Sequence, residues 1–90
     1  DFFPDVLDNL LIDDYVKIND KDSFLMARRL IKEEGLLVGG SSGGAVWAAL
    51  QKAKKLKDNQ NCVVILPDSI RNYISKFVDE SWMDKNKFND

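Results

Sequence analysis

A glycine- and serine-rich stretch at residues 39–44 (Gly-Gly-Ser-Ser-Gly-Gly) constrains the fold of this chain more than any other feature. It follows the short apolar run 36–38 and precedes a helical pattern. Because glycine has no side chain, the backbone can turn sharply here and approach a neighbour closely. Such a turn at the start of a helix exposes backbone N–H groups and the hydroxyls of Ser41 and Ser42. We therefore expect a binding site over these two serines.

Composition and charge limit the classes of function. The chain has 90 residues and a net charge of −2, so it is one small domain or part of a larger one, with no long-range attraction for nucleic acid. Without histidine no Cys/His zinc site can form, and we expect no metal site. The single cysteine, Cys62, lies in an apolar run, which is typical of a buried thiol in a reducing compartment such as the cytoplasm. No apolar run is long enough to cross a membrane.

The first part of the chain predicts a strand followed by a helix. Residues 1–11 are expected to form a loop or a short helical turn, and the apolar–polar alternation of residues 12–18 predicts a strand. Asn19 is a suitable N-cap, so a helix is expected over residues 20–34, with Gly35 as its stop.

The second part predicts a further strand–helix–strand–helix series. The run 36–38 is expected to be a short buried strand, and residues 39–43 the turn before a second helix over residues 44–57. The run 62–66 shows no alternation, as in the central strand of a parallel sheet. A short helix and a last amphipathic stretch complete the chain, with these caps and packing residues: Asp68 or Ser69, Tyr73, Phe77, Trp82, Met83 and Phe88. This order predicts the α/β class, with a mostly parallel sheet flanked by helices.

Residues 39–43 allow four chemical interpretations. They match the G-x-S-x-G pattern of a serine-hydrolase nucleophile elbow, but the chain has no histidine to act as the base. They also suit a phosphate cradle, although no lysine follows as in a P-loop. Alternatively, a serine hydroxyl could hydrogen-bond an uncharged ring nitrogen, such as that of pyridoxal phosphate. The fourth interpretation is a turn that only lets a helix and a strand pack closely, and the pattern leaves all four open.

The segment 67–73 ends the predicted strand 62–66, at the position where open α/β sheets bind ligands. Capping and packing explain its polar side chains better than ligand binding does. We therefore assign no catalytic role to Asp68, Arg71 or Tyr73. The lysines at residues 52–57 are typical of a solvated helix end.

Three parts of the chain carry a resemblance to a known family. They are residues 34–43 (Glu-Gly-Leu-Leu-Val-Gly-Gly-Ser-Ser-Gly), residues 62–73 (Cys-Val-Val-Ile-Leu-Pro-Asp-Ser-Ile-Arg-Asn-Tyr), and the downstream pairs Lys-Phe at 76–77 and Trp-Met at 82–83. With the opening residues 1–8, they make essentially the whole chain resemble the cysteine synthase/cystathionine β-synthase family of fold type II pyridoxal-phosphate enzymes. The glycine–serine turn is shared across that family, whereas the later segments are similar to its cystathionine-forming members.

The resemblance implies that residues 1–90 are the C-terminal segment of the catalytic, cofactor-binding domain and not an independent domain. It implies a β-replacement in which L-serine and L-homocysteine give L-cystathionine and water, a step of transsulfuration and cysteine biosynthesis. L-Cysteine in place of serine would release hydrogen sulfide. In this resemblance Ser41 bonds the pyridine nitrogen of pyridoxal phosphate, Ser42 and Gly43 shape the turn, and the enzyme is a homodimer.

The resemblance also implies what this segment lacks. The Schiff-base lysine and the loops for phosphate and substrate carboxylate would lie upstream, so we expect no catalytic residue in this segment. Alone, it is expected to be inactive and poorly folded. Haem, where present, would bind outside it, and a regulatory domain that senses S-adenosylmethionine could follow it. The alternatives are an O-acetylserine sulfhydrylase (cysteine synthase) and a non-catalytic homologue that acts as a binding module.

Overall fold

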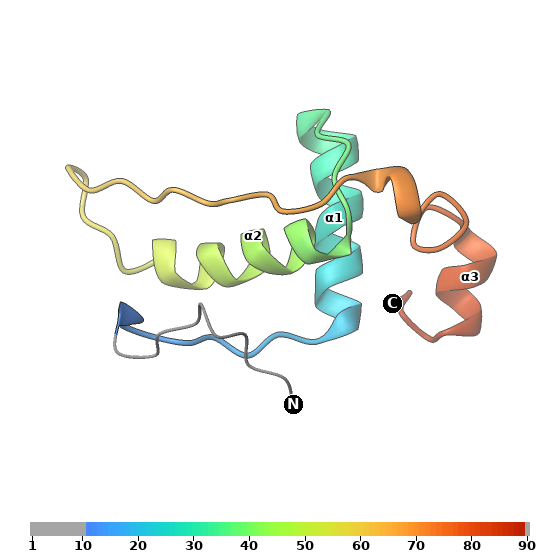
Figure 1. Cartoon of the computed structure of the whole chain (residues 1–90), viewed down its shortest axis with the longest axis horizontal. Helices are drawn as coiled ribbons and strands as arrows, with labels where there is room; N and C mark the ends of the chain where they lie inside the picture. The colour runs from blue at the N-terminus through green and yellow to red at the C-terminus, as the bar shows by residue number, and fades with distance from the viewer. Residues whose placement is uncertain (1–10, 90) are drawn as a thin grey trace.

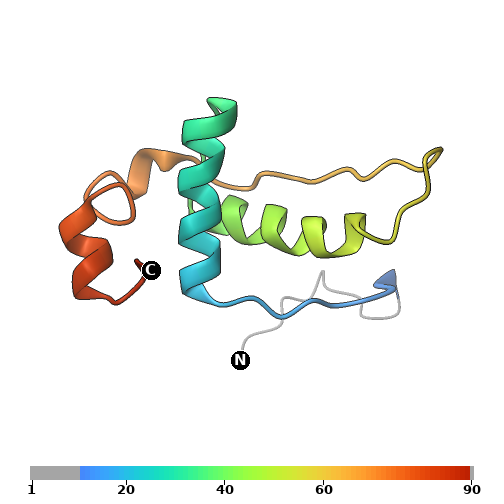
Figure 2. The ribbon, with the colours of Figure 1, turned by 180° about the vertical axis from the view of Figure 1, so that it is seen from behind.

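The computed structural model describes residues 11–89, so the loop expected over residues 1–11 lies almost wholly outside the described part. The helices, in chain order, are α1 (Asp20–Glu34), α2 (Gly40–Ala53), the 3₁₀ helix η2 (Ile70–Asn72) and α3 (Glu80–Lys85). Helix α1 crosses the start of α2, and η2 and α3 lie on the far side of α1 (Figure 1). Two extended segments, 12–19 and 61–68, run along opposite sides of α2, as the view from behind also shows (Figure 2).

Helix α1 has the bounds that the sequence predicts. Asn19 has extended backbone geometry, and its side-chain oxygen accepts a 2.8 Å hydrogen bond from the N–H of Asp22. The first turn carries Asp20 and Asp22, whose carboxylates favour the positive end of the helix dipole. Gly35 ends the helix at a φ of 68°, a left-handed conformation that glycine adopts without strain. The predicted cap, helix and stop are confirmed.

Helix α2 differs from its prediction at both ends. It starts at Gly40, with Gly39 as N-cap, and not at Gly44 after a turn. The glycine-rich stretch can be helical because the Asp68 carboxylate, from elsewhere in the chain, accepts hydrogen bonds from first-turn N–H groups. The predicted end at Lys57 is also wrong, since α2 ends at Ala53. Beyond this point lysines at a spacing of three residues repel one another and disfavour another turn.

Two glycines of α2 let it contact α1 closely. A Cβ atom on Gly43 would collide with the carbonyl oxygen of Ser23 and would lie 2.7 Å from the backbone nitrogen of Ala27. A Cβ atom on Gly44 would lie 2.8 Å from the Ser23 Oγ. The stretch therefore does permit close packing, but between two helices and not between a helix and a strand.

The core lies on two faces of α1. One cluster contains Met26, Leu30 and Val38, with two partly buried α2 residues packed against it. The other contains the fully buried Ala27, Phe77 and Met83 and holds the η2–α3 region against α1. Several aromatic and aliphatic side chains pack on this second cluster, and they confirm the predicted packing roles: Phe24, Tyr73, Trp82 and Phe88, among others.

The C-terminal helices are shorter than the sequence suggests. The predicted helix through Tyr73 and Phe77 is reduced to η2, and these two residues lie in the turns that follow it. Ser69, not Asp68, caps η2, because its Oγ accepts a 3.3 Å hydrogen bond from the N–H of Arg71. Asp79 caps α3 by accepting a 2.7 Å hydrogen bond from the N–H of Ser81.

The predicted sheet does not form among residues 11–89. The segments 12–18 and 62–66 have no ladder, and the run 36–38 contributes one isolated antiparallel bridge, between Val38 and Ser69. A strand needs a neighbour for its backbone N–H and C=O groups, and this stretch of chain supplies none. The prediction that Cys62 is buried is wrong for the same reason: it lies in this uncovered segment and is exposed.

The close contact of α1 and α2 predicts that Gly43→Ala is strongly destabilising in the protein that contains this segment. The added methyl meets backbone atoms of α1, which cannot rotate away, so the two helices must separate. We expect a loss greater than the roughly 1–3 kcal/mol typical of overpacking. The thermal unfolding midpoint of the purified protein measures the effect.

Gly35→Ala is the matched control. No atom lies within 4 Å of a Cβ at that position, so only left-handed strain is added, at a cost of roughly 1–2 kcal/mol. If the two variants lowered the thermal unfolding midpoint equally, the close contact of α1 and α2 at Gly43 would have no special role in stability.

Candidate functional site

The candidate site is the N-terminus of α2, where the Asp68 side chain meets the glycine–serine stretch. The two carboxylate oxygens of Asp68 accept hydrogen bonds from the N–H of Ser41 (3.1 Å) and the N–H of Ser42 (2.8 Å). The Ser42 Oγ lies 2.7 Å from the same carboxylate and 2.9 Å from the Asp68 carbonyl oxygen. The Gly39 N–H also donates to that carbonyl, at 3.2 Å. Residues 26 or more positions apart thus form one polar junction.

The chain geometry explains why these groups meet. The Val38–Ser69 bridge brings the segment before α2 beside the segment before η2, and the Ile70 N–H donates to the Leu37 carbonyl oxygen at 3.2 Å. A Cβ atom on Gly39 would collide with the Asp68 carboxylate, so only glycine leaves room for this contact. Ser42 is fully buried, and its hydroxyl is satisfied by Asp68 alone. It is therefore a structural residue of the junction.

The environment of Asp68 keeps its carboxyl group ionised. Burial by itself raises the pKa of Asp68, but hydrogen bonds from the Ser42 side chain and from the backbone of Ser42 and Ser41 outweigh burial. The nearby Tyr73 hydroxyl acts in the same direction, and the net pKa of Asp68 is below the ordinary value of 3.8. The positive end of the α2 dipole favours the same charged form.

Tyr73 lies beside the junction, with its ring packed against the start of α2. Burial raises the pKa of Tyr73, and the nearby Asp68 charge and the hydrogen bond to Asp68 raise it further. The Ser41 side chain and the Gly40 backbone act in the opposite direction and lower the pKa of Tyr73, but burial and Asp68 outweigh them. The tyrosine is therefore a neutral phenol near neutral pH.

Ser41 is the exposed member of the junction. It lies in the first turn of α2 and lines a pocket of about 200 Å³, together with Tyr73, Gly40 and residues at the start of α1. Its backbone N–H donates to the Asp68 carboxylate, and its side chain lines the pocket. The helix start therefore depends on the backbone of Ser41 and not on its hydroxyl.

Two of the four sequence interpretations of residues 39–43 do not agree with this geometry. A nucleophile elbow holds its serine in a strained turn, but Ser41 is helical, and Lys87 is the only non-glycine residue with positive φ among residues 11–89. A phosphate cradle needs free N–H groups, but the Asp68 carboxylate already accepts hydrogen bonds from Ser41 and Ser42. The hydrolase and phosphate interpretations are therefore wrong for this turn.

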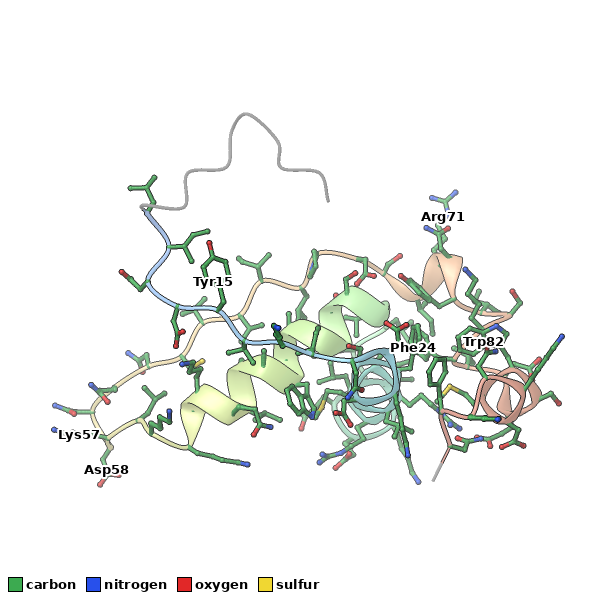
Figure 3. The ribbon with its side chains drawn as sticks, turned by 90° about the horizontal axis from the view of Figure 1, so that it is seen from below. Tyr15, Phe24, Lys57, Asp58, Arg71 and Trp82 are labelled. Carbon is green, nitrogen blue, oxygen red and sulfur yellow. The ribbon has the colours of Figure 1, made fainter. Side chains whose placement is uncertain are left out.

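The remaining candidates of the sequence lie away from this junction. Arg71 is exposed and points away from the ribbon (Figure 3). Lys57 and Asp58 lie at the far end of the long loop that follows α2 (Figure 3). Within residues 11–89 no cluster of acidic or cysteine side chains could hold a metal ion, and no helix is long and apolar enough to span a membrane.

Sequence reasoning placed Asp68 and Tyr73 beside a ligand edge but missed their contact with Ser41. The available signal was an acidic residue two positions after the predicted buried strand 62–66, since strand ends and helix starts meet at the same edge of an α/β sheet. The carboxylate was assigned to the helix that follows it, whereas it caps the helix that precedes it.

Comparison with known proteins defines the class of this chain. The family model described as "Pyridoxal-phosphate dependent enzyme" matches residues 3–68. This match covers more than half of the chain, and the chain belongs to that family. Its cofactor is therefore pyridoxal phosphate, as the resemblance implied.

Individual relatives show which members of this family the chain is similar to. The chain is 58% identical over 90 residues to a Dictyostelium discoideum protein named "Cystathionine beta-synthase", which covers 100% of this chain and 18% of that protein. A Rattus norvegicus protein of the same name is 58% identical over 83 residues, or 92% of this chain and 15% of the relative. A Bacillus subtilis protein named "O-acetylserine dependent cystathionine beta-synthase" is 40% identical over 80 residues, or 89% of this chain and 26% of the relative. The chain thus spans about a quarter or less of these proteins.

The residues at the pocket fit one edge of such a cofactor. Ser41 offers a hydroxyl that can donate to an uncharged ring nitrogen or accept from a charged one. The only carboxylate in the junction is already hydrogen-bonded by the helix start. None of the residues lining this pocket is a lysine, so the pocket offers a wall that a ring could contact and no amine for covalent attachment.

The junction predicts a pH-dependent contribution of Asp68 to stability. Because the folded-state pKa lies below the ordinary value, the ionised form stabilises the fold. This stabilisation is complete above the ordinary value and is lost as the pH falls through the folded-state pKa. Asp68→Asn should cost about 1 kcal/mol near neutral pH, because an amide keeps only one of the two oxygens that accept from the α2 N–H groups, and solvent screening keeps the cost from being larger.

Urea unfolding of the protein that contains this segment, from about pH 7 down to about pH 3, measures the difference between wild type and variant. Asp58→Asn, in the exposed loop after α2, is the control with the same change of charge. A difference that stays constant over this pH range would contradict the role of the Asp68 charge.

Proposed function

We propose that this chain is the C-terminal segment of the catalytic domain of an enzyme that condenses L-serine with L-homocysteine. The products are L-cystathionine and water, formed by β-replacement, and L-cysteine in place of serine gives hydrogen sulfide. The observation that carries the proposal is 58% identity over the full chain to a protein named cystathionine beta-synthase. The relative whose name specifies O-acetylserine is less similar, at 40%, which favours serine as the substrate. The enzyme would be a cytoplasmic homodimer acting in transsulfuration.

Ser41 is the residue that we propose to contact the cofactor. Pyridoxal phosphate, when bound, withdraws electrons from the substrate's α-carbon and so allows a group on the β-carbon to be replaced. A serine next to the ring nitrogen provides a hydrogen bond without a negative charge. The nitrogen can then stay unprotonated, which favours β-replacement over transamination. Ser41 is exposed at the start of α2 and lines the pocket, and both observations support this role.

The exposed apolar segments support the place of this chain in a larger domain. Val63 and Ile65 are 87% and 76% exposed, and both lie in the run predicted to be a central strand. We propose that segments 12–18 and 62–66 pair with strands from elsewhere in the enzyme, completing the mostly parallel sheet of the α/β domain. The covalent lysine, the phosphate loop and any haem or S-adenosylmethionine site would also lie outside residues 1–90.

Substrate choice and cofactor attachment test the proposal in the intact enzyme. We expect a higher kcat/KM for serine with homocysteine than for O-acetylserine with sulfide, since serine is the proposed substrate. Borohydride reduction, digestion and mass spectrometry should then give a pyridoxyl-lysine peptide from outside residues 1–90. The reverse substrate preference would identify a sulfhydrylase. Absence of any pyridoxyl peptide would favour the non-catalytic binding module.

Ser41→Asp tests the proposed ring contact. A carboxylate at this position would keep the ring nitrogen protonated and would also lie close to the Asp68 charge. We expect the cofactor to remain bound through its lysine. Cystathionine formation should fall by about 10²-fold or more, the scale of loss when one hydrogen-bond donor of an active site is removed. Ser41→Asn, which adds similar bulk without charge, is the control and should lose less. Unchanged turnover of Ser41→Asp would remove Ser41 from this role.

A further inference from the structure

The ring of Phe24, on helix α1, limits the space at the start of α2. A Cβ atom on Gly40 would lie 2.7 Å from Cε1 and 3.2 Å from Cδ1 of this ring, so only glycine fits against it. Gly40 does not have a positive φ, so a side chain is excluded here by the ring and not by the backbone conformation. Phe24 and Gly40 both line the pocket that Ser41 also lines. The ring is therefore an apolar part of the pocket wall, beside the exposed serine.

Four other aromatic side chains hold the Phe24 ring in place. It stacks on the fully buried Phe77, with ring centroids 5.6 Å apart. It lies edge-on to Trp82 at 5.3 Å, and these two side chains are close together in Figure 3. The centroids of Tyr73 and Phe88 lie at 6.2 Å and 5.3 Å from that of Phe24. Because closely packed groups transmit a displacement instead of absorbing it, the ring is a fixed stop for the first turn of α2.

The hydrogen bonds of Asp68 hold the same turn but do not set its distance from α1. They engage the backbone N–H groups of Ser41 and Ser42, and such bonds tolerate small shifts. The approach of α2 to α1 is limited by two steric contacts, at Gly40 and at Gly43. Of these two glycines only Gly40 lines the pocket. The contact with Phe24 is thus the one that bears directly on the pocket wall.

We propose that Phe24 is a positioning residue that sets the place of Gly40, and with it the place of the Ser41 hydroxyl relative to the cofactor's ring nitrogen. The inference rests on the proposed contact between Ser41 and the ring. A hydrogen bond weakens steeply outside a narrow range of distance and angle, so a displaced first turn would misplace the hydroxyl. The aromatic side chains that surround Phe24 act on the site only by keeping its ring against Gly40.

Gly40→Ala in the intact enzyme, alone and combined with Phe24→Leu, tests this proposal. The added methyl meets the Phe24 ring and must push the first turn away, whereas leucine has no atom at the position of Cε1 and leaves room for the methyl. The apoenzyme is titrated with pyridoxal phosphate, and binding is followed by the fluorescence of the bound cofactor. We expect Gly40→Ala to weaken binding by about tenfold, since a misplacement of about 1 Å at an active site can cost about 10²-fold in rate. In the Phe24→Leu background the same change should weaken binding by less than about twofold.

The emission of the bound cofactor distinguishes positioning from a general loss of structure. Gly40→Ala should change the emission in the same way as Ser41→Ala, because both variants lose the same hydrogen bond to the ring. Gly35→Ala is the control: its methyl meets no atom within 4 Å and adds only left-handed strain outside the pocket. It should lower the thermal unfolding midpoint and leave cofactor binding and emission as in wild type.

The outcomes separate this inference from the proposed function. If Gly40→Ala weakens binding equally in both backgrounds, or binds as wild type does while Ser41→Ala binds more weakly, Ser41 keeps its role and the role of Phe24 is overturned. If Ser41→Ala leaves binding and emission unchanged, the proposed ring contact itself fails, and the inference falls with it. Phe24→Leu alone, which lets the turn move, should also shift the emission toward that of Ser41→Ala. A wild-type emission of this variant would overturn the proposal even where Gly40→Ala does not fold.

Discussion

The structure depends on one carboxylate placed at the start of one helix. Helix α2 begins in a glycine-rich stretch that has low intrinsic helix propensity and no side-chain cap of its own. Asp68 supplies the missing acceptors, and its carbonyl group ties down the backbone before the helix as well. The same contact connects the two chain segments that flank the pocket. Stability of the helix start and geometry of the candidate site are therefore consequences of a single interaction.

Helix α1 provides the second constraint, because both α2 and the η2–α3 region pack against it. Its Ser23–Ala27 side receives the glycines of α2, and the adjacent aromatic cluster receives the turns after η2. An ion pair between Arg28 and Glu80 adds a polar contact between α1 and α3. As a result, Ser41 and Tyr73 line one pocket beside the start of α1, although 31 intervening residues separate them in the sequence.

Local signals predicted part of this arrangement, and the reasons for success and failure are physical. The cap at Asn19, the helix that follows and the stop at Gly35 depend on neighbouring residues alone, so the pattern was sufficient. The start of α2 depends on Asp68, a contact over 26 residues, and propensity could not locate it. The strands failed for a different reason: a run such as 62–66 has the composition of a buried strand, but its backbone has no partner within the described chain. The exposure of Ser41 near a helix start was predicted, whereas the burial of Ser42 against Asp68 required the fold.

The chemistry of the junction also explains why its carboxylate does not take the place of the serine. Ring nitrogens of this cofactor are commonly paired with an acidic residue. Asp68 is close to the pocket, because its carboxylate accepts a hydrogen bond from the N–H of Ser41, which lines the pocket. The two oxygens of Asp68, however, already accept hydrogen bonds from two backbone N–H groups and the Ser42 hydroxyl, and moving the carboxylate toward a ring would leave those donors of α2 without acceptors. The helix thus retains this acid and presents the uncharged hydroxyl of Ser41 at the pocket wall, where Asp20 is the remaining acidic residue. Because capping the glycine-rich start of α2 occupies the Asp68 carboxylate, the polar group that α2 presents to the pocket is the uncharged hydroxyl of Ser41.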